Sequence, residues 1–305
     1  MPITLEFDAR SLLFIPADAA RFVAKAADRG ADVIVLDLED GVAPSAKQNA
    51  RAALQSAVQG LHRSDCVVYV RVNHEAALLA GDVAAAVASG ADGIVMPKVE
   101  APEQLVRLEA DLRREELQAG LAGPGVRVVV LIETPTGVCR AAEIGSASAR
   151  CVAMGLGAED FSTSMGIDPV VEAMSYPAQA VAIAAVAAGL HPIGLPGSIG
   201  EFTDLNAFRK LAAHARMIGV RGSACIHPAQ VPVLNEVFDG SDAEVLAAER
   251  LLAAFDAALA VGKGAIALDG RMIDEPIANR ARLFLARRNA RIARRAGRFG
   301  AGDGR

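Results

Sequence analysis

The sequence of 305 residues contains no tryptophan, two tyrosines and four cysteines. The cysteines lie far apart and form no Cys-x-x-Cys pair, which argues against a disulfide mini-protein and against a cysteine-based zinc site. No apolar run approaches the roughly twenty residues of a membrane-spanning helix, and the first residues are acidic where a secretory signal needs a basic region. We therefore predict a cytoplasmic protein with free thiols and no association with membranes.

Charge is unevenly distributed along the chain, although the formal net charge is only −5. Residues 280–305 contain nine arginines and one acidic residue, Asp303. A basic end of this kind can bind nucleic acid or another anionic ligand. Aliphatic side chains recur between these arginines at helical spacing, however, which favours an amphipathic helix docked on an acidic body or on a neighbouring subunit. We therefore predict no nucleic-acid partner.

Short apolar runs alternate with longer segments rich in Ala, Leu, Arg and Glu. These runs predict strands at 11–15, 32–38, 66–72, 92–96, 126–132, 151–156, 190–195 and 222–226. Helices are expected at 18–29, 45–59, 77–89, 101–119, 137–145, 176–188, 204–218, 242–261 and 274–296. This order predicts parallel strands that are joined by crossover helices.

Eight strand–helix units favour an α/β fold, a (β/α)8 TIM barrel with a C-terminal helical extension. A doubly wound open sheet is the alternative, but no Gly-x-Gly-x-x-Gly motif opens a helix, so a dinucleotide-binding sheet has no support. We expect a catalytic barrel over residues 1–240. Residues 241–305 should form the helical extension and pack on a neighbouring subunit.

Polar side chains follow nearly every predicted strand, at the point where the strand ends. They include Asp37, Glu39, Asp40, Arg71, Asn73, Lys98, Glu133, Glu159, Asp160 and His227. In a barrel the carboxyl ends of all strands meet at one mouth, where the active sites of such enzymes lie. A purely structural barrel has no need of charges that converge on one mouth, because each unpaired charge is costly to desolvate. The pattern therefore indicates an active site.

Glu133 and Asp160 are the predicted metal ligands. Two carboxylates, together with water and a substrate oxygen, suit Mg²⁺, with Mn²⁺ as the alternative ion. The five histidines are scattered, so no zinc site competes. The structural alternative is that these carboxylates form ion pairs with Arg71 or Lys98. Arg71 itself suits bidentate binding of a carboxylate or a developing oxyanion, or else serves as the counter-ion of a nearby acid.

A second group of cations flanks the first two helices. Arg21 and Lys25 lie four residues apart after the first strand, Arg10 precedes that strand, and Lys47 and Arg51 repeat the spacing in the second helix. Near the mouth of a barrel, such cations could hold phosphate groups. The alternative is that they form solvated helix faces.

Seven segments, in order along nearly the whole chain, carry a family resemblance. They are RSLLFIPADAARFVAKA, VIVLDLEDGVAPSAK, VYVRVN, GIVMPKVE, LIETPTGV, GLGAEDFSTSMGI and IHPAQVPVLNEVF. With these segments the chain resembles the citrate lyase beta-subunit/malyl-CoA lyase superfamily. The resemblance implies a (β/α)8 barrel, a Mg²⁺ ion, reversible carbon–carbon cleavage of acyl-thioesters, and a homo-oligomer, either a trimer or a hexamer.

The resemblance also implies roles for single residues. Glu133 and Asp160 match the two carboxylates that bind Mg²⁺. Arg71 matches the arginine that holds the 2-oxo acid and stabilises enolate charge. Asp274, within GRMIDEP, matches an aspartate that is supplied across a subunit interface and acts as acid and base on the acetyl carbon. That segment favours free coenzyme A as part of the substrate, rather than an acyl-carrier protein.

Further positions match parts of the substrate site. The acidic motif that lines the site and orders water or the pantetheine arm matches Asp37, Glu39 and Asp40, of which we expect Glu39 and Asp40 to be catalytic. The positions that receive the phosphates and adenine of CoA match Arg10, Arg21 and Lys25. The other predicted contacts with the substrate or CoA are Phe14, Pro16, Lys47, Gly157, Ala158 and Glu159.

The predicted activity is Mg²⁺-dependent cleavage of a 3-hydroxyacyl-CoA to acetyl-CoA and a 2-oxo acid. Candidate substrates are malyl-CoA, citramalyl-CoA and citryl-CoA. The alternatives are a malyl-CoA thioesterase on the same site, an acyl-carrier-linked citrate lyase beta subunit, a metal-dependent pyruvate aldolase and a non-catalytic barrel subunit. The chain departs from the family pattern at Ser164, Gly194 and Ile277, and these changes bear on the substrate rather than on the fold or the metal.

Overall fold

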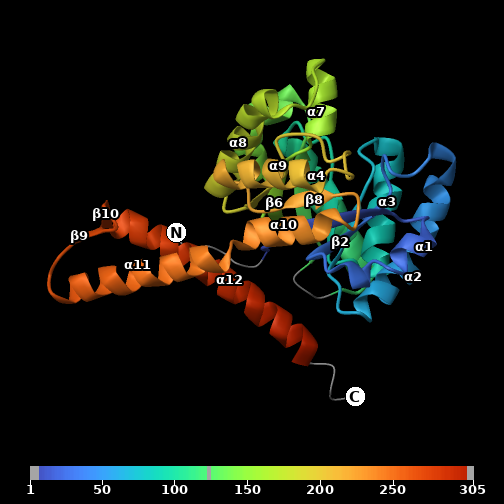
Figure 1. Cartoon of the computed structure of the whole chain (residues 1–305). Helices are drawn as coiled ribbons and strands as arrows, with labels where there is room; N and C mark the ends of the chain where they lie inside the picture. The colour runs from blue at the N-terminus through green and yellow to red at the C-terminus, as the bar shows by residue number, and fades with distance from the viewer. Residues whose placement is uncertain (1–6, 122–124, 301–305) are drawn as a thin grey trace. The chain divides into compact units, whose positions relative to one another are not determined.

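The computed structural model describes residues 7–121 and 125–300, with side chains as far as residue 293. The arginine side chains of the predicted basic end beyond residue 293 lie outside this description. The chain divides into two compact units, Met1–Phe238 and Asp239–Arg305 (Figure 1). In the described part of the chain, no helix is both long enough and apolar enough to cross a membrane.

Eight parallel strands of the first unit form one sheet in the order β7-β6-β5-β4-β3-β2-β1-β8. The strands are β1 (Ser11–Pro16), β2 (Val33–Asp37), β3 (Val68–Arg71), β4 (Gly93–Met96), β5 (Arg127–Ile132), β6 (Cys151–Leu156), β7 (His191–Ile193) and β8 (Ser223–Cys225). A parallel bridge between Ile193 and Gly222 links β7 to the residue before β8, and the Gly194 N–H donates to the Gly222 carbonyl at 3.0 Å. The sheet thus closes on itself, and the predicted (β/α)8 barrel is confirmed.

The strands are buried on both faces, which explains their continuous apolar character. Val35, Tyr69 and Leu131 belong to a cluster made up of side chains from the strands and the residues beside them, which fills the barrel interior. Their sequence neighbours, such as Leu36 and Val70, belong to a second cluster that also contains the inner faces of the helices. Successive side chains of a strand point to opposite faces, so one sequence supplies both layers.

Helices surround the sheet (Figure 1). They are α1 (Ala20–Val23), α2 (Lys47–His62), α3 (Ala76–Ser89), α4 (Pro102–Gln118), α5 (Pro135–Cys139), α6 (Ala141–Gly145), α7 (Ala158–Met165), α8 (Val171–Ala187), α9 (Leu205–Met217) and α10 (Gln230–Asp239). Short 3-10 helices, η1 (Ala27–Arg29) and η2 (Pro44–Ala46), follow β1 and β2. The amphipathic helix α2 buries Ala50, Leu54, Val58 and Leu61, which recur at three- and four-residue spacing.

Three helix predictions were wrong in extent. The helix expected over 18–29 is two short pieces, because α1 ends at Val23 and η1 follows. The helix expected over 137–145 is interrupted at Arg140, which leaves the helical region of backbone angles. The helix expected over 176–188 begins at Val171 and continues through Pro177. Helices α7 and α10 were not predicted, although α7 carries two acids in its first turn, where they complement the helix dipole.

The second unit consists of α11 (Asp242–Ala260), a two-stranded antiparallel hairpin and α12 (Glu275–Gly300). The hairpin strands are β9 (Ala265–Leu268) and β10 (Arg271–Asp274). Asp269 and Gly270 connect them with φ angles of 50° and 74°, as a two-residue hairpin turn of the Asp-Gly type requires. Phe255, Ile273 and Ala278 form a small buried core. The sequence patterns predicted the two helices but not this hairpin.

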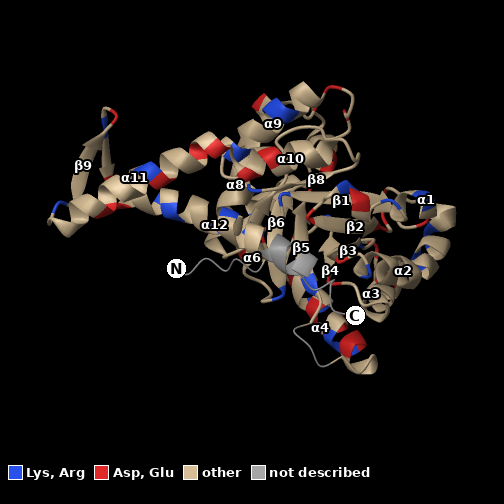
Figure 2. Ribbon diagram, turned by 60° about the horizontal axis from the view of Figure 1, so that its bottom comes forward, with Lys and Arg blue, Asp and Glu red and all other residues tan. Residues whose placement is uncertain are grey.

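Three arginines of α12, Arg282, Arg288 and Arg291, form ion pairs within the second unit. Arg282 donates to Asp256 and Glu275, both at 2.9 Å, and Arg288 donates to Asp242 at 2.7 Å. Figure 2 shows basic residues on α12 and acidic residues on α11. These ion pairs agree with the prediction that the basic segment forms an amphipathic helix that docks on acidic residues.

Candidate active site

Three polar side chains continue the inward-facing rows of the barrel strands. Asp37 follows Val33 and Val35, Arg71 follows Tyr69, and Glu133 follows Leu131, each at two-residue spacing. Two-residue spacing keeps a side chain on the same face of a strand. These residues therefore point into the barrel mouth, at the ends of β2, β3 and β5.

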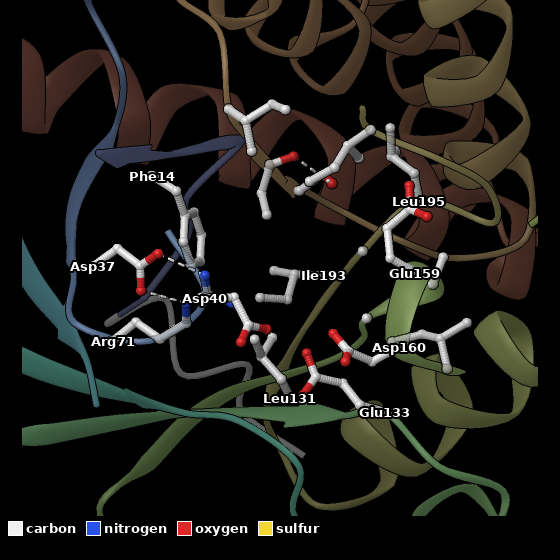
Figure 3. A pocket seen from close by; sticks show the side chains of 18 of the residues that line it. Phe14, Asp37, Asp40, Arg71, Leu131, Glu133, Glu159, Asp160, Ile193 and Leu195 are labelled. Atoms are coloured by element: carbon white, nitrogen blue, oxygen red, sulfur yellow. Dashed lines mark hydrogen bonds and ion pairs between the residues drawn. The ribbon is translucent and has the colours of Figure 1, made fainter. Parts of the chain in front are cut away.

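A cavity of about 450 Å³ occupies this mouth (Figure 3). Ten of the predicted site residues line it: Phe14, Pro16, Asp37, Asp40, Arg71, Glu133, Gly157, Ala158, Glu159 and Asp160. The other lining residues are Gly41, Leu131, Leu156, Ile193, Gly194, Leu195, Gly197, Ile199, Ser223, Ala224 and Ile226. The size is within the usual range for a small-molecule site.

Arg71 is held in a fixed orientation by two acids. Its Nε and Nη2 donate to the two oxygens of Asp37 at 2.7 and 2.6 Å, and its Nη1 lies 2.9 Å from Glu39 Oε2. The guanidinium also lies over the ring of Phe14, 5.2 Å from the centroid. Burial alone would lower the pKa of Arg71, but the hydrogen bonds and charge of Asp37 outweigh it and raise the pKa. Arg71 therefore stays charged.

Arg71 also keeps donors free for a ligand. A guanidinium has five N–H bonds, and Asp37 accepts one from Nε and one from Nη2. Nη1 forms an ion pair with Glu39 but no hydrogen bond, since Glu39 Oε2 has no hydrogen-bond partner among the described residues. N–H bonds on both terminal nitrogens remain. Asp37 is fully occupied, because it also accepts hydrogen bonds from the backbone N–H groups of Glu39 and Gly41, both at 2.9 Å. Asp37 thus acts by orienting Arg71 and the loop after β2.

Glu133 is a buried carboxylate with few neighbouring groups that stabilise its negative charge. The Lys98 backbone N–H donates to its Oε2 at 2.8 Å. Burial, followed by the charges of Asp160 and Glu39, raises the pKa of Glu133 to about 8. Gly157 makes room for this carboxylate, because a Cβ at position 157 would lie 2.4 Å from Glu133 Oε1.

Lys98 connects the acids of the mouth. Its Nζ lies 3.0 Å from Glu39 Oε1, 3.4 Å from Asp40 Oδ2 and 3.5 Å from Asp160 Oδ1. Burial would lower the pKa of this amine, but the hydrogen bond and charge of Glu39 prevail and raise it. The predictions left Lys98 out of the site. It was named only as a residue at the end of the fourth predicted strand and as an alternative ion-pair partner of Glu133 or Asp160, and the contact with Asp160 is present. Its backbone has an unusual φ of 52°.

Glu133 and Asp160 fit a divalent cation. Figure 3 shows both carboxylates directed into the same part of the cavity, and the charge of Asp160 raises the pKa of Glu133. A divalent ion would offset that repulsion with the oxygen ligands that Mg²⁺ prefers. Among the described residues, no group of three or more His, Cys, Asp or Glu could hold a metal ion. The chain therefore offers two carboxylates and leaves the remaining positions to water or substrate.

Two predicted substrate contacts are placed elsewhere by the structure. Arg10 lies before β1, at the opposite end of the strand from the cavity, where it is buried and bidentate to Asp32 at 2.8 Å. This position argues against the predicted contact with CoA. Lys47 donates its ammonium hydrogens to the carbonyls of Leu38 and Glu39 and to the side chain of Asn73. These three acceptors use all its donors, so Lys47 stabilises the loop after β2.

The predicted CoA cations Arg21 and Lys25 are exposed, on and just after α1. They follow β1 and so lie beyond its carboxyl end. Among the described residues, neither has an ion-pair partner. Phe22, between them, is 60% exposed. This small surface is available for a ligand.

Asp274 lies in the second unit, at the end of β10 and directly before α12. Its Oδ1 accepts from the Ile277 backbone N–H at 3.4 Å. Its half-buried side chain does not belong to the cavity lining of the first unit.

Comparison with known proteins finds a matching family and several similar proteins. The model of the HpcH/HpaI aldolase/citrate lyase family matches residues 10–228. Citrate lyase subunit beta of Escherichia coli (strain K12) is 32% identical over 284 residues, covering 91% of this chain and 92% of that protein. L-malyl-CoA/beta-methylmalyl-CoA lyase of Cereibacter sphaeroides (strain ATCC 17029 / ATH 2.4.9) is 35% identical over 288 residues, covering 87% and 90%.

A solved structure is similar over most of the chain. The crystal structure of protein CitE from Mycobacterium tuberculosis, in complex with magnesium, acetoacetate and coenzyme A, has a TM-score of 0.75 and 29% identity. The match covers 92% of the present chain and 98% of the CitE chain.

The chain belongs to the HpcH/HpaI aldolase/citrate lyase family. The predicted family is thereby confirmed, and so is the predicted class of enzyme, a carbon–carbon lyase.

Proposed function

We propose that the protein cleaves a 3-hydroxyacyl-CoA to acetyl-CoA and a 2-oxo acid with the help of Mg²⁺, and catalyses the reverse condensation. The observation that carries this proposal is the meeting of Glu133, Asp160 and an oriented Arg71 in one cavity. The named relatives support it, since they include a malyl-CoA lyase and a neighbour that binds magnesium and coenzyme A.

Glu133 and Asp160 would hold the ion. When bound, Mg²⁺ supplies positive charge that lowers the pKa of a coordinated hydroxyl and stabilises the oxygen anion derived from it. Lys98 keeps Asp160 and Glu39 close to this point through its ammonium group. Gly157 keeps the space that the Glu133 carboxylate needs.

Arg71 would bind the carboxylate of the 2-oxo acid fragment with free N–H bonds on its two terminal nitrogens. The plane of its guanidinium is set by Asp37 and Glu39, so the donors are oriented before the substrate arrives. Preorganised donors of this kind stabilise charge that develops during the reaction.

In the cleavage direction the bond between the hydroxyl-bearing carbon and the thioester α-carbon breaks. The hydroxyl gives its proton to water and becomes the carbonyl group of the 2-oxo acid. The electron pair of the broken bond passes to the α-carbon, which leaves as the enolate of acetyl-CoA. Asp274 would give that carbon a proton, and in condensation it would remove one.

The position of Asp274 in the second unit fits donation from another subunit of a homo-oligomer. We propose that the exposed cations Arg21 and Lys25 receive phosphate groups of CoA. Since phosphate contacts of this kind add binding without taking part in bond breaking, their removal should affect KM more than kcat.

Product analysis tests the proposal. The protein is incubated with Mg²⁺ and malyl-CoA, citramalyl-CoA or citryl-CoA, and acetyl-CoA, 2-oxo acid and free CoA are measured separately. Equal amounts of acetyl-CoA and 2-oxo acid are expected. Free CoA with an intact hydroxy acid would identify a thioesterase instead, and no turnover would contradict the proposed lyase.

A further inference from the structure

The cavity has two chemically different sides. The side built from the ends of β2, β3, β5 and β6 carries all the ionisable groups among its described lining residues. The other side, formed by β7, β8 and the segments that follow them, carries none. Its residues are Ile193, Gly194, Leu195, Gly197, Ile199, Ser223, Ala224 and Ile226.

Negative charge predominates on the ionisable side. Five of the described lining residues are acids, namely Asp37, Asp40, Glu133, Glu159 and Asp160, and one is a base, Arg71. The nearby ammonium of Lys98 already faces three carboxylates, on Glu39, Asp40 and Asp160. A bound Mg²⁺ would offset two of the negative charges. The described lining residues then provide no cation for a second substrate carboxylate.

The uncharged side borders an acid rather than a base. Glu159 Oε1 forms a hydrogen bond with the hydroxyl of Ser198, in the segment after β7 that also provides Leu195 and Ile199. Glu159 and Leu195 both line the cavity (Figure 3). A carboxylate placed against this side would therefore meet apolar surface and a like charge, both of which disfavour it.

The apolar character of this side is built into the backbone. Gly194 has a φ of 106°, and a Cβ there would lie 2.5 Å from the Leu156 carbonyl oxygen. Ile193 and Leu195 on either side of it are buried, at 4% and 2% exposure. Position 194 thus carries no side chain, and its neighbours present aliphatic groups to the cavity.

We propose that the 2-oxo acid fragment is a monocarboxylate with a small apolar substituent, as in pyruvate, so that citramalyl-CoA is the preferred class of substrate. This inference rests on the proposed function. The carboxylate and 2-oxo group of the fragment occupy the charged side, where Arg71 and the metal carboxylates lie. Its third substituent faces Ile193 and the rest of the uncharged side. The methyl group of pyruvate makes apolar contacts there, and the hydrogen of glyoxylate makes none. The second carboxylate of oxaloacetate finds no cation among the described lining residues.

The test compares kcat/KM for cleavage of citramalyl-CoA, malyl-CoA and citryl-CoA. The expected preference for citramalyl-CoA is about tenfold over each of the others, the usual value of one methyl-sized group in an apolar pocket. A preference for malyl-CoA or citryl-CoA would overturn the inference and leave the proposed lyase intact. If none of the three is cleaved, the proposed function fails. Calorimetric binding of pyruvate and oxaloacetate to the Mg²⁺-loaded protein then decides the inference, and tighter binding of oxaloacetate would overturn it.

Ile226 offers a matched pair of variants. Its side chain is 46% exposed, so a longer side chain can be accommodated without disturbing the core. Ile226→Lys supplies the missing cation and should raise the ratio of citryl-CoA to citramalyl-CoA cleavage by about tenfold. Ile226→Met changes shape without charge and should keep the order of the three substrates. An equal shift in both variants, or none in Ile226→Lys, would contradict the charge argument.

Discussion

Arg71 and Asp37 are register partners on neighbouring parallel strands, and their side chains are joined by two hydrogen bonds of 2.7 and 2.6 Å. This pair fixes the plane of the guanidinium at the mouth of the barrel. Because Asp37 is also held by two backbone N–H groups, the orientation of Arg71 is anchored to the loop that follows β2.

Replacement of Arg71 by lysine should lower kcat/KM about 100-fold or more, because an ammonium cannot be held by Asp37 and also present two parallel donors to the substrate. Steady-state cleavage kinetics measure the effect. Arg150→Lys is the matched control, since Arg150 makes a similar two-bond pair with Glu116, both bonds at 2.7 Å, before β6 and away from the cavity. Equal losses in both variants would refute a specific role for Arg71.

A methyl group at position 157 should weaken Mg²⁺ binding about tenfold or more, because Gly157→Ala places Cβ 2.4 Å from Glu133 Oε1 and displaces that carboxylate. Isothermal titration with Mg²⁺ tests this. The control is Gly60→Ala in α2, where the new Cβ makes only an ordinary contact of 3.9 Å with the Arg63 guanidinium and should stabilise the helix by about 0.5–1 kcal/mol. Unchanged Mg²⁺ affinity in Gly157→Ala would mean that Glu133 is not a ligand.

Mg²⁺ binding should compete with a proton on Glu133. The pKa of this carboxyl is raised from 4.5 to about 8 in the metal-free protein, so the group is protonated over most of that interval. Since the ion requires the carboxylate, its apparent affinity should rise with pH, by up to about tenfold per unit, and level off above about pH 8. Titration calorimetry in buffers of different ionisation enthalpy measures both the affinity and the released proton. An affinity that stays constant between about pH 6 and about pH 8 would contradict this assignment.

The barrel was predictable because its strands are apolar on both faces and end in polar residues. Counting in steps of two from Val35, Tyr69 and Leu131 places Asp37, Arg71 and Glu133 at the mouth, and the structure agrees. The same reasoning would have placed Arg10 at the opposite end, since Arg10 precedes its strand. Arg10 was instead grouped with the cations near the mouth, and the resemblance matched it to a CoA-binding position.

Other parts of the site depend on tertiary features that spacing does not reveal. Lys98 reaches the acids through a backbone with positive φ, and Lys47 turns back to carbonyls of the loop after β2. The uncharged side of the cavity comes partly from β7 and β8, each only three residues long, whose patterns are weak. The hairpin of the second unit did have a sequence signature, the Asp269-Gly270 pair.

Loss of the Asp274 carboxylate should abolish turnover but not metal binding, because Asp274 lies outside the unit that holds the metal carboxylates. Asp274→Asn should lower kcat about 100-fold or more and leave Mg²⁺ affinity unchanged. Asp269→Asn, in the turn of the same hairpin, is the matched control and should remain active. Mixing subunits that carry Asp274→Asn with subunits that carry Glu133→Gln should restore part of the activity. If the mixture stays inactive, Asp274 does not act on the site of another subunit.

The most direct test of the account is the Mg²⁺ dependence of carbon–carbon cleavage in protein stripped of metal by a chelator. Acetyl-CoA and 2-oxo acid are followed while Mg²⁺ is added back to the wild type and to Asp160→Asn. The account predicts no cleavage in the stripped protein, full recovery in the wild type, and little or no recovery in the variant. Cleavage in the presence of chelator, or equal recovery in Asp160→Asn, would contradict the assignment of Glu133 and Asp160 as a metal site.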